Sequence, residues 1–169
     1  LGYDTNGFLI SRTEPFTNVA ATVTTRFGVN DVGWKFAETN ALGEVATVKY
    51  DLNGNPAFRV DPLQRSFTSV FDPNGNLLAQ NDGKGQWTRY LYDAANQRVA
   101  LTNRAGHIWR YEFTPRGAPW RTTDPLNNVV ENTYDDANRL VRTTFPTVKG
   151  IAAFTELRYD RNGNLTNSI

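Results

Sequence analysis

Aspartates followed closely by glycine recur along this 169-residue chain, and they are its most obvious candidates for chemistry. The sequence Asp-x-Asn-Gly begins at Asp4, Asp51, Asp72 and Asp160. These side chains carry the oxygen ligands that calcium prefers, but one such tetrapeptide supplies fewer than the ~6 oxygens that calcium takes. Alternatively, the carboxylate accepts backbone N–H groups and caps a turn. We expect capped turns, and calcium binding by these turns is left open.

The other residues that could act in catalysis or ligand binding are isolated. His107 is the only histidine and there is no cysteine, so a transition-metal site or a Ser-His-Asp triad would depend on that one residue. Asp135 and Asp136 are adjacent, and adjacent strand residues point to opposite faces. Gly83-Lys84-Gly85 is too short for a phosphate-binding loop. We therefore predict a protein that is not an enzyme, with no catalytic residue, no cofactor site and no metal site.

Charge and composition exclude several classes of partner. The 18 basic and 17 acidic residues are spread along the chain, which argues against nucleic acid. No apolar run approaches the ~20 residues that span a bilayer, so we expect no membrane insertion. The chain is 39% hydrophobic, enough to bury a core. It contains no methionine, even at its first position, which suggests a fragment of a larger chain.

The aspartates belong to a repeat of about 21 residues, in which an aromatic anchor precedes the turn. Four residues after each anchor stands Gly or Asn, the residues that tolerate a positive φ. Tyr3 begins a further copy, and Phe27 a weaker one with Gly33 in the glycine position after a two-residue insertion. The main repeat positions, which we expect to be structural, are Tyr50, Asp51 and Gly54; Phe71, Asp72 and Gly75; Tyr92, Asp93 and Asn96; Phe113 and Gly117; Tyr134, Asp135 and Asn138; and Tyr159, Asp160 and Gly163.

A second series of turn sequences lies midway between the anchors. Asp or Asn opens each of these turns, and most end in Gly or Asn, as turn chemistry requires. The short runs between turns have strand length and are rich in Thr, Val and aromatic residues. The midway turns are Asn40–Gly43, Asp61–Gln64, Asp82–Gly85, Asn103–Gly106 and Asp124–Asn127.

Turn, strand, turn, strand in every repeat predicts an all-β repeat protein of ~21-residue β-hairpin units in an antiparallel sheet. Trp109, Tyr111 and Phe113 would share one face, which predicts that one face is more buried than the other. About eight units give ~16 strands and a width of roughly 75 Å, so the twisted sheet must coil or close. We expect one array over residues 1–169, with loop insertions near 13–26 and 145–155.

The aromatic residues are the remaining surface candidates. The four tryptophans and the Tyr and Phe columns would form ladders across neighbouring strands. Such columns usually pack together, although they could also form a sugar- or peptide-binding face. The four tryptophans are Trp34, Trp87, Trp109 and Trp120.

The repeated Tyr-Asp-x-x-Gly pattern resembles the YD-repeat or Rhs family along essentially the whole chain. The copies that carry the resemblance include Tyr50-Asp51…Gly54, Tyr92-Asp93…Arg98-Val99, Tyr134-Asp135…Arg139-Leu140 and Tyr159-Asp160…Gly163. The resemblance implies a long β-sheet that spirals into a hollow shell, which in bacterial members encloses a C-terminal toxin. This chain is much shorter than a closed shell and has no aspartic-protease-like segment. The resemblance therefore favours part of a shell or stalk.

These observations predict a structural segment of a large secreted or cell-surface protein that encloses or displays another domain, for example a C-terminal toxin. Its partners would be flanking repeats or domains of the same parent chain, with self-association through sheet edges as a further expectation. The alternative is an adhesive or filament-forming surface module that binds carbohydrate through its aromatic residues.

Overall fold

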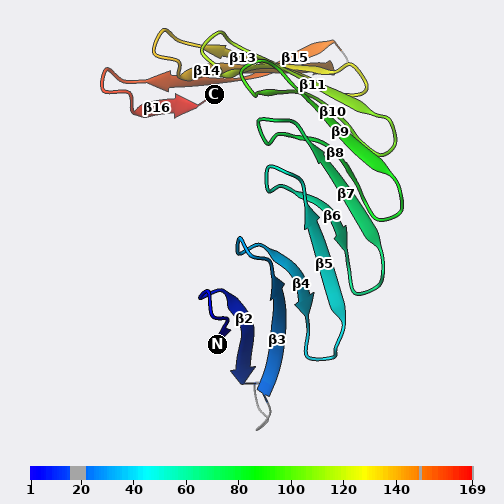
Figure 1. Ribbon diagram of the computed structural model, residues 1–169. Coiled ribbons are helices and arrows are strands. Elements are labelled where there is room, and N and C mark those ends of the chain that lie inside the picture. The colour runs from blue at the N-terminus through cyan, green and yellow to red at the C-terminus, as the bar shows by residue number, and fades with distance from the viewer. Residues whose placement is uncertain (16–21, 149, 169) are drawn as a thin grey trace. The chain divides into compact units, whose positions relative to one another are not determined.

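The computed structural model of the chain describes residues 1–15, 22–148 and 150–168, and the strands among them run in sheet order from β1 to β16 (Figure 1). The described residues form no helix. Wherever a strand pair has a defined register, for example β5 with β6, the pairing is antiparallel. The prediction of an all-β antiparallel fold with about sixteen strands is confirmed.

The chain divides into two compact units, residues 1–87 and 88–169. Strand β9 begins with the last residue of the first unit and otherwise belongs to the second. The first unit contains β1 (Gly2–Tyr3), β2 (Leu9–Pro15), β3 (Thr22–Val29), β4 (Lys35–Thr39), β5 (Val45–Tyr50), β6 (Pro56–Val60), β7 (Ser66–Phe71) and β8 (Leu77–Asn81). The second contains β9 (Trp87–Tyr92), β10 (Arg98–Thr102), β11 (Ile108–Phe113), β12 (Pro119–Thr123), β13 (Val129–Tyr134), β14 (Leu140–Val148), β15 (Ile151–Tyr159) and β16 (Leu165–Ser168).

The alternation predicted for the strand that ends at Phe113 is confirmed in β11. Trp109, Tyr111 and Phe113 are half-buried, whereas Arg110 and Glu112 are exposed. Side chains alternate between the two faces of a strand, so these three aromatic rings lie on the same face of the second unit. The alternation is partial in other strands, because their small and polar residues shield less surface.

The described part of the chain has almost no buried core. Only Ala118 and Asp61 are buried in it, with 9% and 7% of their surfaces exposed. The hydrophobic content of the sequence had led us to expect a core. Within each unit, however, the paired strands form a single layer, and one layer cannot bury its apolar side chains against a second.

The two insertions mainly lengthen hairpins, instead of forming the loops that the sequence suggested. Strand β2 runs to Pro15 and pairs there with Thr22, the first residue of β3. In the second unit, Val148 at the end of β14 pairs with Ile151 at the start of β15. The β-branched run that begins at Thr22 favours extended backbone, which explains the difference. Residues 16–21 and 149 of the expected loops lie outside the described part.

The repeat assigned to Phe27 is in a different frame from the predicted one. Asn30 donates its N–H to the carbonyl of Trp34 at 2.9 Å, and Gly33 donates to the carbonyl of Asn30 at 2.9 Å. Asn30 is therefore the capping residue and Val29 takes the anchor position, without any insertion. The assignment to Phe27 was wrong because the cap and the left-handed glycine set the frame, and an aliphatic residue can take the anchor position.

Candidate functional site

The turns that follow the anchors, called anchor turns below, share one hydrogen-bonded frame. In the turn at Asp51, Gly54 donates its N–H to the Asp51 carbonyl at 3.1 Å and has a φ of 86°. The Asp51 carboxylate oxygen Oδ1 accepts the N–H groups of Asn53 at 2.9 Å and Asn55 at 2.8 Å. Asp51 is the cap, and Asn55, four positions later, is called the closing residue. This is an Asx-capped turn followed by a left-handed residue, as predicted from the sequence.

The capping carboxylates are already occupied by donors, which bears on the calcium alternative. The second oxygen of Asp51, Oδ2, accepts the side-chain N–H of Asn55 at 3.0 Å. This bond from Asn55, together with the backbone N–H groups, lowers the pKa of Asp51. Converging N–H groups favour an anion and supply no oxygen to a cation. In the described part of the chain, no group of three or more His, Asp or Glu residues is arranged to hold a metal ion.

Three tyrosine anchors of the described chain each join their turn to the preceding one. The hydroxyl of Tyr50 donates to the carbonyl of Lys35 at 2.7 Å. Lys35 directly follows the closing residue of the preceding anchor turn. The same bond joins Tyr134 to the carbonyl of Pro119 at 2.6 Å, and Tyr159 to that of Leu140 at 2.9 Å. The anchor tyrosine therefore fixes the distance between neighbouring repeats.

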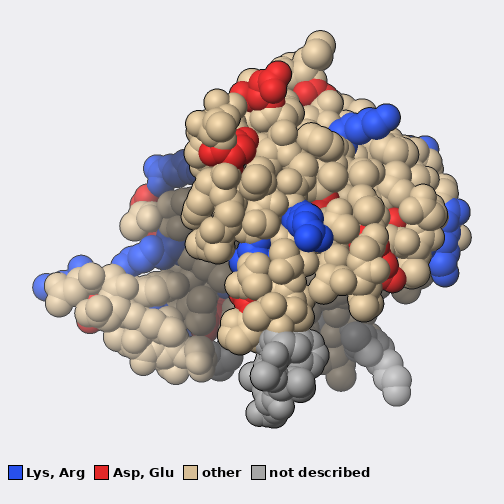
Figure 2. All heavy atoms as spheres, turned by 60° about the horizontal axis from the view of Figure 1, so that its bottom comes forward, with Lys and Arg blue, Asp and Glu red and all other residues tan. Residues whose placement is uncertain are grey.

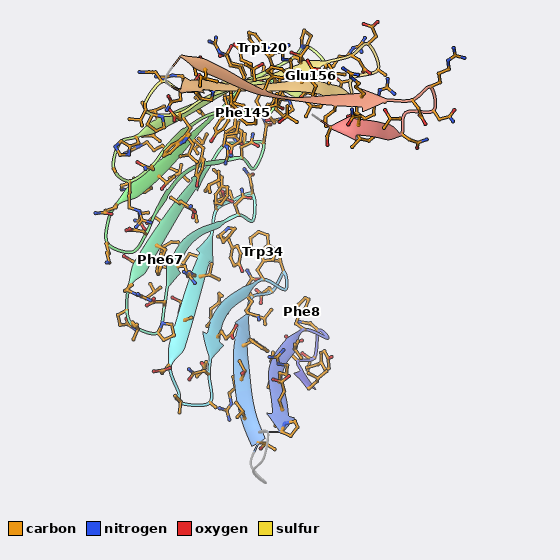
Figure 3. The ribbon with its side chains drawn as sticks, turned by 180° about the vertical axis from the view of Figure 1, so that it is seen from behind. Phe8, Trp34, Phe67, Trp120, Phe145 and Glu156 are labelled. Carbon is orange, nitrogen blue, oxygen red and sulfur yellow. The ribbon has the colours of Figure 1, made fainter. Side chains whose placement is uncertain are left out.

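Closing residues form a second link, because several of them lie against the left-handed glycine of the next anchor turn. The Trp34 ring lies 2.8 Å from where a Cβ on Gly54 would stand, and the Phe8 ring lies 2.6 Å from the same position on Gly33. Phe8 and Trp34 extend from neighbouring turns at one edge of the first unit (Figure 3). Glycine is thus required here twice, by its positive φ and by the lack of space for a side chain.

The same link recurs in the second unit with polar closing residues. Gln97 donates its side-chain N–H to the carbonyl of Gly117 at 3.2 Å, and Arg139 lies 3.4 Å from the Cβ position of Gly163. The closing residue Ala118 is small, and the next turn then has Asn138 at the left-handed position, with a φ of 61°. In these steps, a large closing residue is followed by glycine and a small one by asparagine.

The midway turns are capped like the anchor turns but are less closely linked. Asp61 accepts the N–H groups of Leu63 and Arg65, and its Oδ2 also accepts the Arg65 side chain at 2.7 Å. Burial raises the pKa of Asp61, but these hydrogen bonds outweigh burial and the pKa is lowered. No atom of the described chain lies within 4 Å of the Cβ positions of Gly43, Gly85 and Gly106.

The sequence predicted ladders of aromatic rings across neighbouring strands. In the described chain, most of the ring contacts are instead with the side chain of a Lys or Arg. One ring pair is close, Trp34 with Tyr50, whose centroids are 5.1 Å apart. Elsewhere a cation lies over a ring, as Lys35 does over Phe27 at 3.7 Å. Such contacts are favourable even where the ring is partly exposed. Other examples are Arg59 over Phe67, Arg139 over Tyr159 and Arg142 over Phe154.

The other residues considered for catalysis or ligand binding lie in separate turns. His107 is an exposed closing residue whose backbone N–H donates to the Asn103 side chain at 3.0 Å. Asp135 caps its turn and binds Arg139, whereas the Asp136 carbonyl accepts the Arg116 side chain. Charges of both signs are scattered over the face shown in Figure 2, with uncharged surface between them. Over the described residues, no helix is long and apolar enough to cross a membrane.

Sequence reasoning identified the caps and the left-handed positions but missed both links between turns. The tyrosine bond joins residues 15 or 19 positions apart, and the closing residues form a column that lies outside the repeated motif. Aligning that column would have shown large side chains at Phe8 and Trp34 preceding glycine in the next turn. The closing residue stands one position after the Gly or Asn that ends the repeat motif, so the sequence alone could have indicated this link.

Comparisons with known proteins agree with this repeat geometry. Residues 71–108 match the family model described as RHS Repeat. No curated protein matches the chain. Solved structures share its fold, and three of them serve as examples. They are a Photorhabdus luminescens Tc holotoxin pore with a TccC3 mutation (TM-score 0.70, 17% identity, 96% of this chain), a TcdB2-TccC3 complex (0.71, 16%, 98%), and TcdB2-TccC3 without its hypervariable C-terminal region (0.72, 16%, 98%).

The likeness extends over nearly all of this chain but over a small part of those proteins. The chain spans 10% or 11% of the matched chains. At such low identity the solved structures establish the fold, and the family model supplies the sequence relationship within residues 71–108. The capped turns and the antiparallel hairpins continue the same unit on both sides of that match. Residues 71–108 are thus similar to the RHS repeat in sequence, and the hairpins on both sides share its fold.

Proposed function

We propose that the chain is a non-enzymatic structural segment of a larger secreted or cell-surface protein. In that protein it forms part of a β-sheet wall that encloses or displays another domain, such as a C-terminal toxin. The observation that supports this most directly is the pair of links between successive anchor turns, by the Tyr50 hydroxyl and by the Trp34 ring. These links use the repeat motif to hold neighbouring hairpins at a fixed spacing, which is what a wall requires.

The lack of a core also favours a wall within a larger assembly. Large apolar side chains are exposed on both units, among them Phe36 at 47% and Trp120 at 41%. Contiguous apolar surface usually marks a site that another element covers. In this proposal, flanking repeats or domains of the parent chain supply that cover, and residues 1–169 form one continuous array of about eight units.

The solved structures support the same role by analogy. One of them is a Tc holotoxin pore, and another is named for the removal of a hypervariable C-terminal region. If the chain forms a wall around such a region, its repeat-motif residues would be needed to hold neighbouring hairpins together, and this is what they do in the turns. Secretion and the enclosed domain follow from this analogy and belong to the proposal.

The carbohydrate-binding alternative is not favoured by a specific observation. The Trp34 ring packs on Gly54 and Tyr50, so its faces already take part in holding turns together. Trp120 is 41% exposed, and Arg121 of the same strand lies 6.0 Å from its ring centre.

Limited proteolysis of the parent protein tests the wall function. We expect a domain downstream of this segment to resist protease in the native protein and to be cut when Gly54→Ala disturbs the anchor turns. Gly43→Ala is the matched control, because Gly43 has a similar φ of 80° but open space around it. Digestion of the native downstream domain as fast as the isolated domain would refute enclosure.

A further inference from the structure

Asparagine directly precedes glycine at four anchor turns, and such a pair can react within itself. The backbone nitrogen of the glycine attacks the side-chain carbonyl carbon of the asparagine, a carbon–nitrogen bond forms, and ammonia leaves. Water then opens the resulting succinimide ring at either of its two carbonyl groups, which gives aspartate or isoaspartate without oxidation or reduction. Isoaspartate carries the main chain through the former side chain and so adds a methylene group to it. The four asparagines are Asn6, Asn53, Asn74 and Asn162.

Two of these pairs lie in consecutive anchor turns, those of Asp51 and Asp72, which have the same internal frame. The glycine N–H of each turn is donated to the carbonyl of the capping aspartate, at 3.1 Å from Gly54 and at 3.0 Å from Gly75. The asparagine N–H is donated to Oδ1 of the cap at 2.9 Å in both turns. The attacking nitrogen is thus held in a hydrogen bond, so the reaction requires local opening of the turn.

The Asp51 turn is held by contacts from the preceding repeat. The Trp34 ring lies 2.8 Å from the position where a Cβ on Gly54 would stand, and Gly54 is half-buried. The Tyr50 hydroxyl also donates to the carbonyl of Lys35 at 2.7 Å. Opening of this turn must separate the ring from the glycine and break the tyrosine bond, so its open state is sparsely populated.

The Asp72 turn is held less firmly. Its anchor is Phe71, which has no hydroxyl to donate. Gly75 is exposed, and apart from its chain neighbours only one atom of the described chain, Asn55 Oδ1, lies within 4 Å of its Cβ position, at 3.8 Å. The same reactive pair therefore stands in a turn that opens at a lower cost.

We propose that Asn74 deamidates spontaneously in the folded protein, whereas Asn53 is protected by the contacts of its turn. The product at Asn74 carries a carboxylate, and its isoaspartate form lengthens the main chain within the turn. The lengthened chain does not fit the frame in which Asp72 Oδ1 accepts two backbone N–H groups, so the β7–β8 hairpin loosens at its anchor turn. This inference is independent of the wall function proposed above.

Incubation of the folded 169-residue chain at mildly alkaline pH, followed by tryptic digestion and mass spectrometry, tests the inference. Trypsin places Asn53 in peptide 50–59 and Asn74 in peptide 66–84, and fragmentation assigns the modified residue. Each rate is divided by the rate of the same residue in urea, which removes the effect of different sequence neighbours. We expect the normalised rate at Asn74 to exceed that at Asn53 at least about tenfold, because opening at Asn53 also loses an aromatic contact and a hydrogen bond.

Trp34→Ala tests the cause of the protection. It should raise the rate at Asn53 about tenfold and leave the rate at Asn74 unchanged, so that Asn74 in the same molecule controls for global unfolding. Trp120→Ala, in the second unit, is the matched control and should change neither rate. Tyr50→Phe keeps the ring and should raise the rate at Asn53 about fivefold through loss of one hydrogen bond.

Equal normalised rates at Asn53 and Asn74 in the folded chain would overturn the inference, as would an Asn53 rate that Trp34→Ala leaves unchanged. If Trp34→Ala accelerates both sites, the milder Tyr50→Phe variant decides. Faster reaction at Asn53 alone in that variant supports the inference, and an unchanged Asn53 rate overturns it.

Discussion

Anchor turns and midway turns have nearly the same internal frame but different surroundings. Asp51 and Asp61 both cap a turn with two backbone N–H groups on one carboxylate oxygen. The anchor turns also receive the tyrosine bond, at Tyr50, Tyr134 and Tyr159, and a closing residue against the left-handed glycine, whereas among the described midway glycines Gly83 alone has such a neighbour, Arg65 at 3.5 Å. The cap therefore makes a hairpin, and the additional contacts arrange hairpins into an array.

Strand register shows the same difference. In the β5–β6 hairpin the register shifts beside Tyr50, at the anchor turn. The β4–β5 hairpin, closed by a midway turn, pairs Ala37 with Thr47 and Thr39 with Val45 without a shift. An extra residue on one side of a pair increases the local twist. The anchor edge thus combines the irregular register with the links, and the midway edge remains regular.

The largest expected effect comes from placing a side chain in the link between turns. Gly54→Ala combines a positive φ with a clash against Trp34, and we expect it to lower the free energy of unfolding by about 3 kcal/mol. Gly43→Ala meets only the backbone penalty of about 1 kcal/mol. Urea denaturation measures both. Equal losses would contradict the distinction between the two edges, and Trp34→Ala should relieve part of the Gly54→Ala loss.

Removal of one tyrosine hydroxyl should give a smaller loss. Tyr134→Phe removes the shorter of two hydrogen bonds to the carbonyl of Pro119, which keeps the one from the Asn132 side chain at 3.0 Å, and should cost about 1 kcal/mol in urea denaturation. Tyr111→Phe, whose hydroxyl forms no bond within the described chain, should change stability by less than about 0.3 kcal/mol. A loss at Tyr134 no greater than that at Tyr111 would show that the bond does not link repeats.

A substitution in a midway turn should stabilise the fold, by an amount similar to or smaller than the loss expected for Tyr134→Phe. Gln64 has a φ of 61°, a conformation that costs a residue other than Gly or Asn about 1 kcal/mol. Gln64→Gly should therefore raise the midpoint of thermal unfolding, although the freer unfolded chain offsets part of the gain. Gln80→Gly, within strand β8, is the comparison and should lower the midpoint.

The smallest expected effect per turn is the pH dependence of stability that each capping aspartate contributes. Hydrogen bonds from Asn55 and Asn76 lower the pKa values of Asp51 and Asp72. A carboxyl with a lowered folded pKa stabilises the fold above its unfolded pKa, and this contribution is lost as pH falls through the folded pKa. Urea midpoints should therefore fall in acid. Asp51→Asn should flatten that fall, since Asn30 and Asn40 already cap turns with an amide. An unchanged acid profile would exclude Asp51 as a contributor.

The sequence predicted the features that arise within one hairpin. Caps such as Asp51 and left-handed positions such as Asn96 follow from local turn chemistry, and the strand alternation of β11 follows from side-chain type. The contacts between repeats were missed because they join residues that are distant in sequence, such as Tyr50 and Lys35. The expectation of a core failed because composition does not specify how many layers a sheet has.

The tyrosine link also bears on how such arrays change length. Each hydroxyl reaches only the preceding repeat, as Tyr134 reaches Pro119, so no contact of this kind depends on the total number of repeats. Stability in linear repeat proteins is close to a sum of units and neighbouring interfaces. Duplication or deletion of one whole 21-residue unit would therefore join equivalent partners again, and recombination between repeats could lengthen or shorten the gene while the protein remains foldable.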